Sequence, residues 1–297
     1  MATVATLGPA IPVHAPGSAV PAAGTADPGA VQIPVHRLSG VARVWADRLL
    51  GVFSRSAFDG IEWSLKFSTD GLVGDRFLLA LSREHWSRLD GVDLARMLAI
   101  PADLWNAIQA DMQRAQVAYF SYEPDDGAGT YRMYLEILPT DPALQEARSL
   151  PLGRGYKWDP VRGERFAVTD YQMRYLDSAQ AFGAYVQPYL ERLSAQPLQD
   201  MARRVLAAAQ EQADPCRFMF LEATEADTRR DSFSVTFRGA QLPLRRFVPD
   251  LLQLATALAL PSQQVLDYLV PDEPRSLCSL AAGVTRRGQD FLTVYYD

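Results

Sequence analysis

Five pairs of strand-like segments recur along this 297-residue chain, and stretches with helical periodicity separate each pair from the next. In the first pair, residues 61–68 (IEWSLKFS) alternate apolar and polar side chains, and a turn at Asp70–Gly71 leads into a second strand over residues 75–81. Two such strands joined by a short turn form a β-hairpin with one apolar and one polar face. Similar pairs occupy residues 117–138, 155–176, 216–239 and 276–297. The pattern predicts about ten strands, antiparallel within each pair.

A single closed barrel accommodates these hairpins best. Separate domains would each need a core of their own, which a chain of this length does not supply. Closing the sheet removes every unpaired strand edge, and a barrel of about ten strands leaves a lumen wide enough for a ligand. We therefore expect an α/β (α+β) fold of one domain over residues 34–297, with helices outside the barrel. Residues 1–33 are rich in Ala and Pro and are expected to form a flexible or extended tail.

Composition excludes several classes of function. The net charge of −6 provides no excess of cations for non-specific binding to nucleic acid. No apolar run approaches the roughly 20 residues that a membrane span needs. Cys216 and Cys278 make no disulfide framework, which favours a reducing cytoplasm. The three histidines match no metal-ligand spacing, so no metal site is expected, and we expect a soluble monomer.

The polar faces of the hairpins point into the lumen if the apolar faces pack against the helices. The lumen then receives Glu62, Ser64, Lys66, Arg76, Arg132, Tyr134, Lys157, either Asp170 or Tyr171, Ser234, Thr236, Thr293, and either Tyr295 or Tyr296. Arg and Lys neutralise a diphosphate, tyrosine rings stabilise a nearby carbocation, and a carboxylate such as Glu62 accepts a proton. The set suits an anionic ligand with an apolar or cationic portion. Each residue taken alone is more often solvated, and periodicity does not decide which face is the lumen.

One stretch resembles a known family. SLKFSTDGLVGDRFLLALSREHW (residues 64–86) resembles the first hairpin of the ABBA-type (αββα-barrel) prenyltransferases. Ile61–Glu62, Asp70–Leu72 and Arg76–Leu79 stand in an order and spacing similar to that hairpin, most closely to the cyanobactin (RiPP) peptide prenyltransferase branch. YRMYLEI, GYKWDPVRGERFAVTDY and FLTVYYD are similar to later strands of the family, so the resemblance extends over residues 40–297.

The resemblance implies a transferase that moves a dimethylallyl (C5) group from dimethylallyl diphosphate to a Trp, Tyr, His or Arg side chain of a ribosomally made peptide, linear or macrocyclic. It implies that the diphosphate is bound by Arg76, Arg132, Tyr134, Tyr171 and Tyr295, with Lys157 as a further candidate ligand, and that Glu62 is the catalytic base. We expect the prenyl pocket at the fourth hairpin, lined by Met219, Phe220, Ser234 and Thr236, with Met219 and Phe220 setting the length of the C5 chain. Ser234 and Thr236 stand where the family often has a tyrosine pair. The family lacks an aspartate-rich metal motif, as does this sequence. The sequence leaves open whether Mg²⁺ assists the reaction by binding through the diphosphate.

Two alternatives remain open from the sequence. The same fold acting on a small indole or phenol would have a narrower barrel mouth than one acting on a peptide. A non-catalytic barrel that binds a hydrophobic ligand would not need the charges of Glu62, Arg76 and Arg132. The sequence also leaves open whether the donor carries a C5 or a C10 chain.

Overall fold

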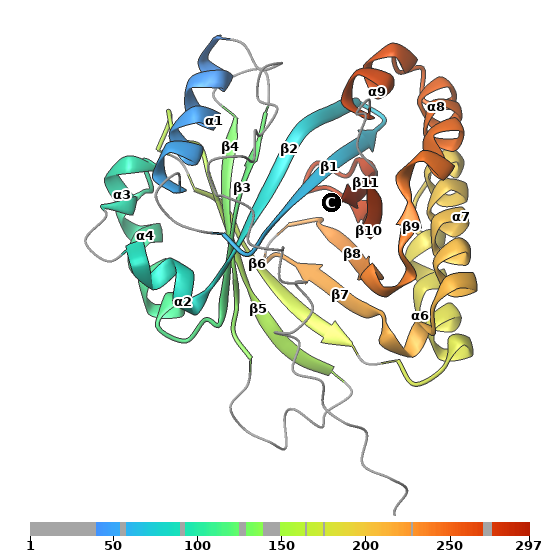
Figure 1. Cartoon of the computed structure of the whole chain (residues 1–297), viewed down its shortest axis with the longest axis horizontal. Helices are drawn as coiled ribbons and strands as arrows, with labels where there is room; N and C mark the ends of the chain where they lie inside the picture. The colour runs from blue at the N-terminus through green and yellow to red at the C-terminus, as the bar shows by residue number, and fades with distance from the viewer. Residues whose placement is uncertain are drawn as a thin grey trace, which may run out of the picture.

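A computed structural model describes residues 40–53, 58–89, 93–124, 129–138, 149–163, 165–174, 176–226, 228–269 and 275–297. Within these residues the strands form a closed barrel, and helices cover its outside (Figure 1). The expected closed barrel with helices outside it is therefore confirmed. The expected tail over residues 1–33 lies outside the described residues.

Five consecutive hairpins build the barrel. Their strands are β1 (Gly60–Ser68), β2 (Gly71–Ser82), β3 (Val117–Glu123), β4 (Thr130–Glu136), β5 (Ser149–Trp158), β6 (Arg165–Arg174), β7 (Met219–Thr224), β8 (Asp231–Thr236), β10 (Ser276–Val284) and β11 (Asp290–Tyr296). Every neighbouring pair is antiparallel, and pairing of β11 with both β10 and β1 closes the ring. A two-residue strand, β9 (Leu242–Pro243), adds to β10 outside the ring.

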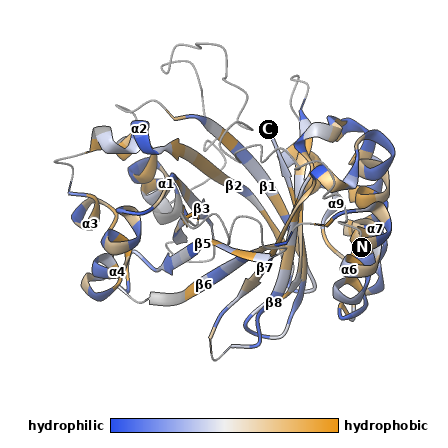
Figure 2. Ribbon diagram, turned by 90° about the horizontal axis from the view of Figure 1, so that it is seen from below, coloured by the Kyte–Doolittle hydropathy of each residue, from blue (hydrophilic) through white to orange (hydrophobic). Residues whose placement is uncertain are grey.

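The helices lie in two groups on opposite sides of the barrel (Figures 1 and 2). The first group contains α1 (Gly40–Phe53), α2 (Arg83–Trp86), α3 (Leu94–Met97) and α4 (Ala102–Met112). The second group contains α6 (Ala179–Glu191), α7 (Gln196–Gln212), α8 (Val248–Ala257) and α9 (Ser262–Leu269). Short 3₁₀ turns lie at η3 (Ser87–Leu89), η4 (Pro215–Arg217), η5 (Arg238–Ala240) and η6 (Leu244–Phe247). None of the described helices is long and apolar enough to cross a membrane.

The hydrophobic core lies between the outer face of the barrel and the helices. On β1, Trp63, Leu65 and Phe67 are buried in this core, because alternate side chains of a strand point to opposite faces. The polar residues between them, such as Glu62 and Ser64, face the lumen. The alternation that defines the hairpins in the sequence thus separates the core from the lumen.

The antiparallel pairing also gives the barrel two different ends. Each hairpin begins and finishes at the same end and makes its turn at the other, so all five turns gather at one end. We call this the turn end, and the opposite end, where the helical segments connect successive hairpins, the connection end. Residues near a hairpin turn therefore come together in space although they are far apart in the sequence.

Candidate active site

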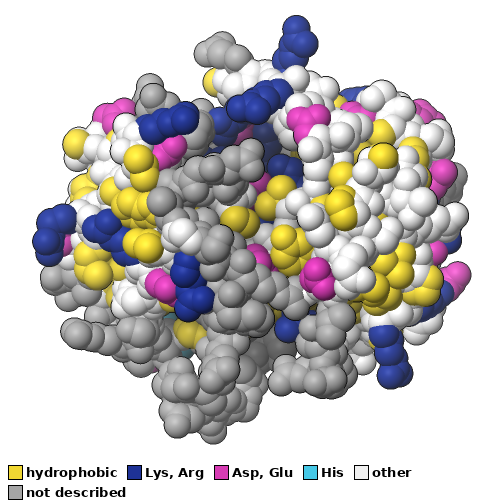
Figure 3. Space-filling model, turned by 90° about the horizontal axis from the view of Figure 1, so that it is seen from above, with side chains coloured by type: hydrophobic (Ala, Val, Ile, Leu, Met, Phe, Trp, Pro, Cys, Tyr) yellow, Lys and Arg dark blue, Asp and Glu magenta, His cyan; other side chains and the backbone are white. Residues whose placement is uncertain are grey.

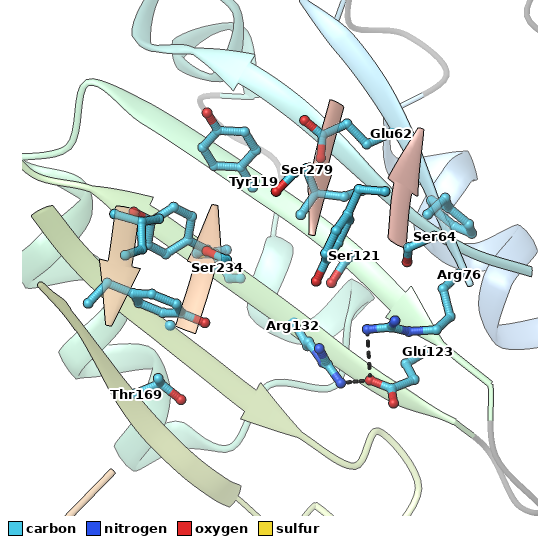
Figure 4. Close-up of a pocket in the computed structure, with 18 of the residues that line it drawn as sticks. Glu62, Ser64, Arg76, Tyr119, Ser121, Glu123, Arg132, Thr169, Ser234 and Ser279 are labelled. Carbon is cyan, nitrogen blue, oxygen red and sulfur yellow. Dashed lines mark ion pairs between the residues drawn. The ribbon is translucent and has the colours of Figure 1, made fainter. Parts of the chain in front are cut away.

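A cavity of about 210 Å³ lies inside the barrel. Its wall comes from strands of all five hairpins, so no single hairpin could form it alone. In the space-filling view, Lys and Arg side chains are seen in a recess near the top of the picture (Figure 3). The close-up shows the polar side chains that line the cavity (Figure 4).

Five basic side chains gather toward the turn end, and we call them the cationic cluster: Lys66, Arg76, Arg132, Lys157 and Arg230. They come from β1, β2, β4, β5 and the residue before β8. Glu123, the last residue of β3, forms an ion pair with three of them. Its carboxylate lies 3.4 Å from Lys66 Nζ and 3.6 Å from Arg76 Nη2, and it contacts Arg132 (Figure 4).

The position of Arg76 depends on a β-bulge in the first hairpin. Lys66 pairs with Val73, but Ser64 pairs with Arg76, so the register changes by one residue between these pairs. Asp75, inside the bulge, has a left-handed φ of 51°. Without the extra residue Asp75 would lie opposite Ser64, and Arg76 would point outward into the helices. The bulge therefore turns the guanidinium of Arg76, which is 6% exposed, into the lumen.

Several donors of the cationic cluster are buried without a partner. Nε and Nη1 of Arg76 and Nε of Arg132 have no hydrogen bond among the described residues. Burying such charged donors costs free energy unless an acceptor satisfies them. The other carboxylate nearby, Glu225, is already held by Arg230 at 2.5 Å and by Arg286 at 2.5 Å. The arrangement therefore suits an incoming polyanion.

The electrostatics of the cluster support the same conclusion. Burial, reinforced by repulsion from Arg76 and Arg132, lowers the pKa of Lys66 to about 7. Burial also lowers the pKa of Lys157 well below its usual range, with repulsion from Arg132 and Arg230 adding to the shift. The pKa of Arg132 falls to about 9 for the same reasons. A bound anion would reverse these shifts, because it attracts the charged forms of all three groups.

A wall of tyrosine rings continues from the cationic cluster toward the connection end. Tyr119 and Tyr134 stack with their centroids 5.4 Å apart, and Tyr171 meets Tyr134 edge-on at 4.7 Å. The hydroxyl of Tyr134 is buried and has no hydrogen-bond partner among the described residues. Tyr295, on β11, also lines the cavity and hydrogen-bonds Arg76. Such ring faces attract a cation placed against them.

The structure settles two alternatives that the sequence left open. Tyr171 lines the cavity, whereas Asp170 points outward and lies 3.1 Å from Arg154. Tyr295 lines the cavity, whereas Tyr296 belongs to the outer core. In both pairs the neighbours point to opposite faces of one strand.

The connection end of the cavity carries two further carboxyl groups. Glu62 forms an ion pair with Arg238, which also lies 3.2 Å from Asp297. Glu136, at the end of β4, is hydrogen-bonded to the hydroxyl of Tyr119. Figure 4 shows Glu62 and Tyr119 on the side of the cavity away from Arg132 and Glu123. The lumen is therefore cationic at the turn end and carries carboxyl groups at the connection end.

Most of the residues that the sequence singled out meet in this cavity. Those that line it are Glu62, Ser64, Arg76, Arg132, Tyr134, Lys157, Tyr171, Tyr295, Met219, Ser234 and Thr236. Lys66 and Thr293, also expected in the lumen, are not among the residues of the cavity wall. The expectation that Phe220 lines the prenyl pocket is wrong. Its ring is fully buried on the outer face of β7, where it stacks on Phe233 at 5.4 Å and meets Tyr185 of α6 at 5.1 Å. Because Met219 faces the lumen, its neighbour on the strand must face the helices.

Sequence reasoning missed several residues of the cavity wall. They are Ser121, Thr169, Ser279, Tyr119, Glu123, Glu136, Arg230 and Arg238. The alternation itself could have found Tyr119, Glu123 and Glu136, which lie an even number of positions from other lumen residues of their strands. No periodic signal marks Arg230 or Arg238, since both lie outside the barrel strands. The described residues contain no group of three or more His, Cys, Asp or Glu placed to hold a metal ion.

Comparison with known proteins identifies the fold. No protein-family model matches the chain, and no curated protein matches it. Among solved structures, PriB in a binary complex with the product diphosphate has a TM-score of 0.57 at 11% identity. That match covers 87% of this chain and 90% of PriB. The prenyltransferase NotF, solved with brevianamide F and DMSPP, has a TM-score of 0.51 at 12% identity, covering 86% of this chain and 88% of NotF.

Identities this low establish the architecture alone. In this chain that architecture is a closed antiparallel barrel of five hairpins, with helices outside it and a polar cavity within. This chain therefore has the ABBA (αββα) barrel fold of the prenyltransferases.

Proposed function

We propose that this protein is a prenyltransferase that uses dimethylallyl diphosphate as its donor. The observation that carries the proposal is the buried cationic cluster, with unpartnered donors on Arg76 and Arg132, next to a wall of tyrosine rings. A prenyl diphosphate has this polarity, since an anionic head is joined to a short apolar chain that becomes cationic when it leaves. Support also comes from the neighbours, because PriB was solved with diphosphate and NotF with DMSPP.

The cationic cluster would hold the diphosphate and stabilise its departure. In the reaction the bond between C1 of the dimethylallyl group and the diphosphate oxygen breaks, and its electron pair leaves with the diphosphate. Arg76, Arg132 and Lys157 offset the charge that develops on that oxygen. Donors already fixed in a buried site need no rearrangement at that moment, which lowers the barrier.

The tyrosine wall would protect the allyl cation. Tyr119, Tyr134 and Tyr171 present ring surfaces beside the cationic cluster, and ring faces stabilise a desolvated cation by about 2 kcal/mol or more. The same rings occupy space that water would otherwise fill, which limits loss of the cation to hydrolysis. Ser234 and Thr236 also line the cavity. Their hydroxyl groups would shield the cation less well than aromatic rings at the same positions.

The acceptor that we propose is a nucleophilic Trp, Tyr, His or Arg side chain of a peptide, linear or macrocyclic, as the resemblance to the cyanobactin (RiPP) branch implies. A small indole or phenol is the second candidate. The cavity volume of about 210 Å³ favours it, as does the complex of NotF with brevianamide F. Both acceptors would approach from the connection end, because the cationic cluster occupies the other.

The test combines binding and transfer. Calorimetry with inorganic pyrophosphate measures occupation of the cationic cluster. Mass spectrometry then follows incubation with dimethylallyl or geranyl diphosphate and a panel of Trp, Tyr, His and Arg peptides, free tryptophan and simple phenols. A mass gain on peptides supports the first acceptor class, and a gain on the free aromatics alone supports the second.

Two controls sharpen this test. Repeating the binding measurement with EDTA and with added Mg²⁺ shows whether the metal assists through the diphosphate. The variant Arg76→Ala should fold and lose transfer. Absence of pyrophosphate binding, or equal turnover by this variant, would refute the proposed function and favour a barrel that only binds a hydrophobic ligand.

A further inference from the structure

The two carboxyl groups at the connection end differ in their partners. Glu62 contacts the guanidinium of Arg238, so a proton added to Glu62 would break an ion pair. Glu136 makes no ion pair among the described residues, and its carboxylate accepts a hydrogen bond from the hydroxyl of Tyr119. A carboxylate without a cationic partner accepts a proton more readily than one held by arginine.

Glu136 is also placed suitably along the reaction path. Arg132, Tyr134 and Glu136 are alternate residues of β4, so all three point into the lumen, and each lies about 7 Å beyond the last. The ring of Tyr134 therefore lies between the cationic cluster and Glu136. A nucleophile that attacks a cation held against Tyr134 from the connection end arrives beside Glu136.

We infer that Glu136, and not Glu62, takes the proton of the nucleophile in prenyl transfer, and that the acceptor presents this proton toward β4. The inference rests on the proposed function. The nucleophilic atom forms a bond to C1 of the dimethylallyl cation and then loses its hydrogen. The electron pair of the broken bond stays on the acceptor, and the proton goes to a carboxylate oxygen of Glu136. Glu62, paired with Arg238, is left to orient the acceptor.

The titration of Glu136 agrees with this geometry. Burial raises its pKa to about 7, against the opposing effect of the hydrogen bond from Tyr119. Among the described residues, Tyr134 on its own strand also interacts with Glu136, Tyr171 meets Tyr134, and the charge of Asp59 acts on Tyr119. Burial also raises the pKa of Tyr119 and of Tyr134 well above the usual range, so both hydroxyls stay neutral. Near pH 7, Glu136 thus exchanges a proton readily in either direction.

The variants Glu136→Gln and Glu62→Gln test the inference on the full chain. Transfer to the acceptor turned over from the panel above is measured by mass spectrometry between pH 5.5 and 9, and pyrophosphate affinity is measured by calorimetry. We expect the kcat/KM of the wild type to fall below about pH 7 as Glu136 becomes protonated. Glu136→Gln should lose about 10²–10⁴-fold in kcat and the acid limb of the profile, with pyrophosphate affinity unchanged.

The controls separate a chemical role from a structural one. Glu62→Gln should raise KM for the acceptor and keep the acid limb. Glu136→Asp should recover part of the activity with a displaced acid limb, and it decides the question if Glu136→Gln does not fold. The inference is overturned if Glu136→Gln keeps the acid limb and a rate within tenfold of wild type, or if Glu62→Gln removes that limb. If the wild type transfers to none of the acceptors, the proposed function itself is overturned.

Discussion

Replacing Arg76 by Gln should separate donor binding from stability. Nε and Nη1 of Arg76 are buried without partners, so both are free to bind a diphosphate. A hydrogen bond to a charged group contributes about 1.5–3 kcal/mol. Two such bonds contribute about 3–6 kcal/mol, which corresponds to a Kd for pyrophosphate about 10²–10⁴-fold weaker in the variant.

The same substitution should not destabilise the protein in the absence of a ligand. Arg76 is the largest source of the repulsion that, together with burial, lowers the pKa of Lys66 to about 7, and its charge also lowers the pKa of Arg132. Removing one cation relieves that repulsion, while Lys66 and Arg132 remain to pair with Glu123. We therefore expect a thermal midpoint equal to or above that of the wild type.

Calorimetry with pyrophosphate and thermal denaturation measure the two effects on the same samples. Arg96→Gln is the matched control, because the Arg96 side chain is 81% exposed, pairs with Asp93 three residues earlier and lies in the first helical group, outside the barrel. It should change neither quantity. The reasoning fails if Arg76→Gln binds pyrophosphate within about threefold of wild type, or if it unfolds at a markedly lower temperature.

Other predictions follow from the same cavity. Pyrophosphate binding above pH 7 should take up protons, because the anion raises the lowered pKa of Lys66, and calorimetry in buffers of different ionisation enthalpy measures this uptake. Without ligand, Lys66 binds a proton more readily in the unfolded protein than in the folded one, because burial lowers its pKa. The free energy of unfolding should therefore decrease as the pH falls from about 10 toward 7, as urea denaturation would show. Phe220→Ala should cost about 3–5 kcal/mol in urea denaturation and leave pyrophosphate affinity unchanged, since this ring faces the helices. Met219→Gly should leave the fold intact and raise the turnover of geranyl relative to dimethylallyl diphosphate; an unchanged ratio would remove Met219 from the prenyl pocket.

The sequence already contains most of the information that defines the barrel. Alternation along β1 identifies Trp63 and Leu65 as core residues and Glu62 and Ser64 as lumen residues, because the side-chain period of a strand is two. Five such hairpins in one chain favour a closed ring, because closure leaves no strand edge unpaired. The same rule excludes Phe220 from the pocket that Met219 lines, because adjacent residues of a strand face opposite sides.

Which residues meet inside the barrel depended on the tertiary structure. Glu136 and Tyr119 belong to partner strands, but the cavity that they share with Arg230, Arg238 and Tyr295 forms only when the ring closes. Arg238 reaches Glu62 from a 3₁₀ turn that carries no periodic signal.

Arg76 shows the division most clearly. The sequence by itself determined that a cation precedes an apolar run in the second strand of the first hairpin. Its direction was decided by one extra residue at the bulge, because a register shift of one exchanges the two faces of a strand. Its chemical meaning was decided by the barrel, which brings Arg132, Lys157 and Arg230 from three other hairpins beside Arg76 and its hairpin partner Lys66. The local sequence pattern determines which side chains share one face of a strand. Only the packed structure determines which groups that face contacts.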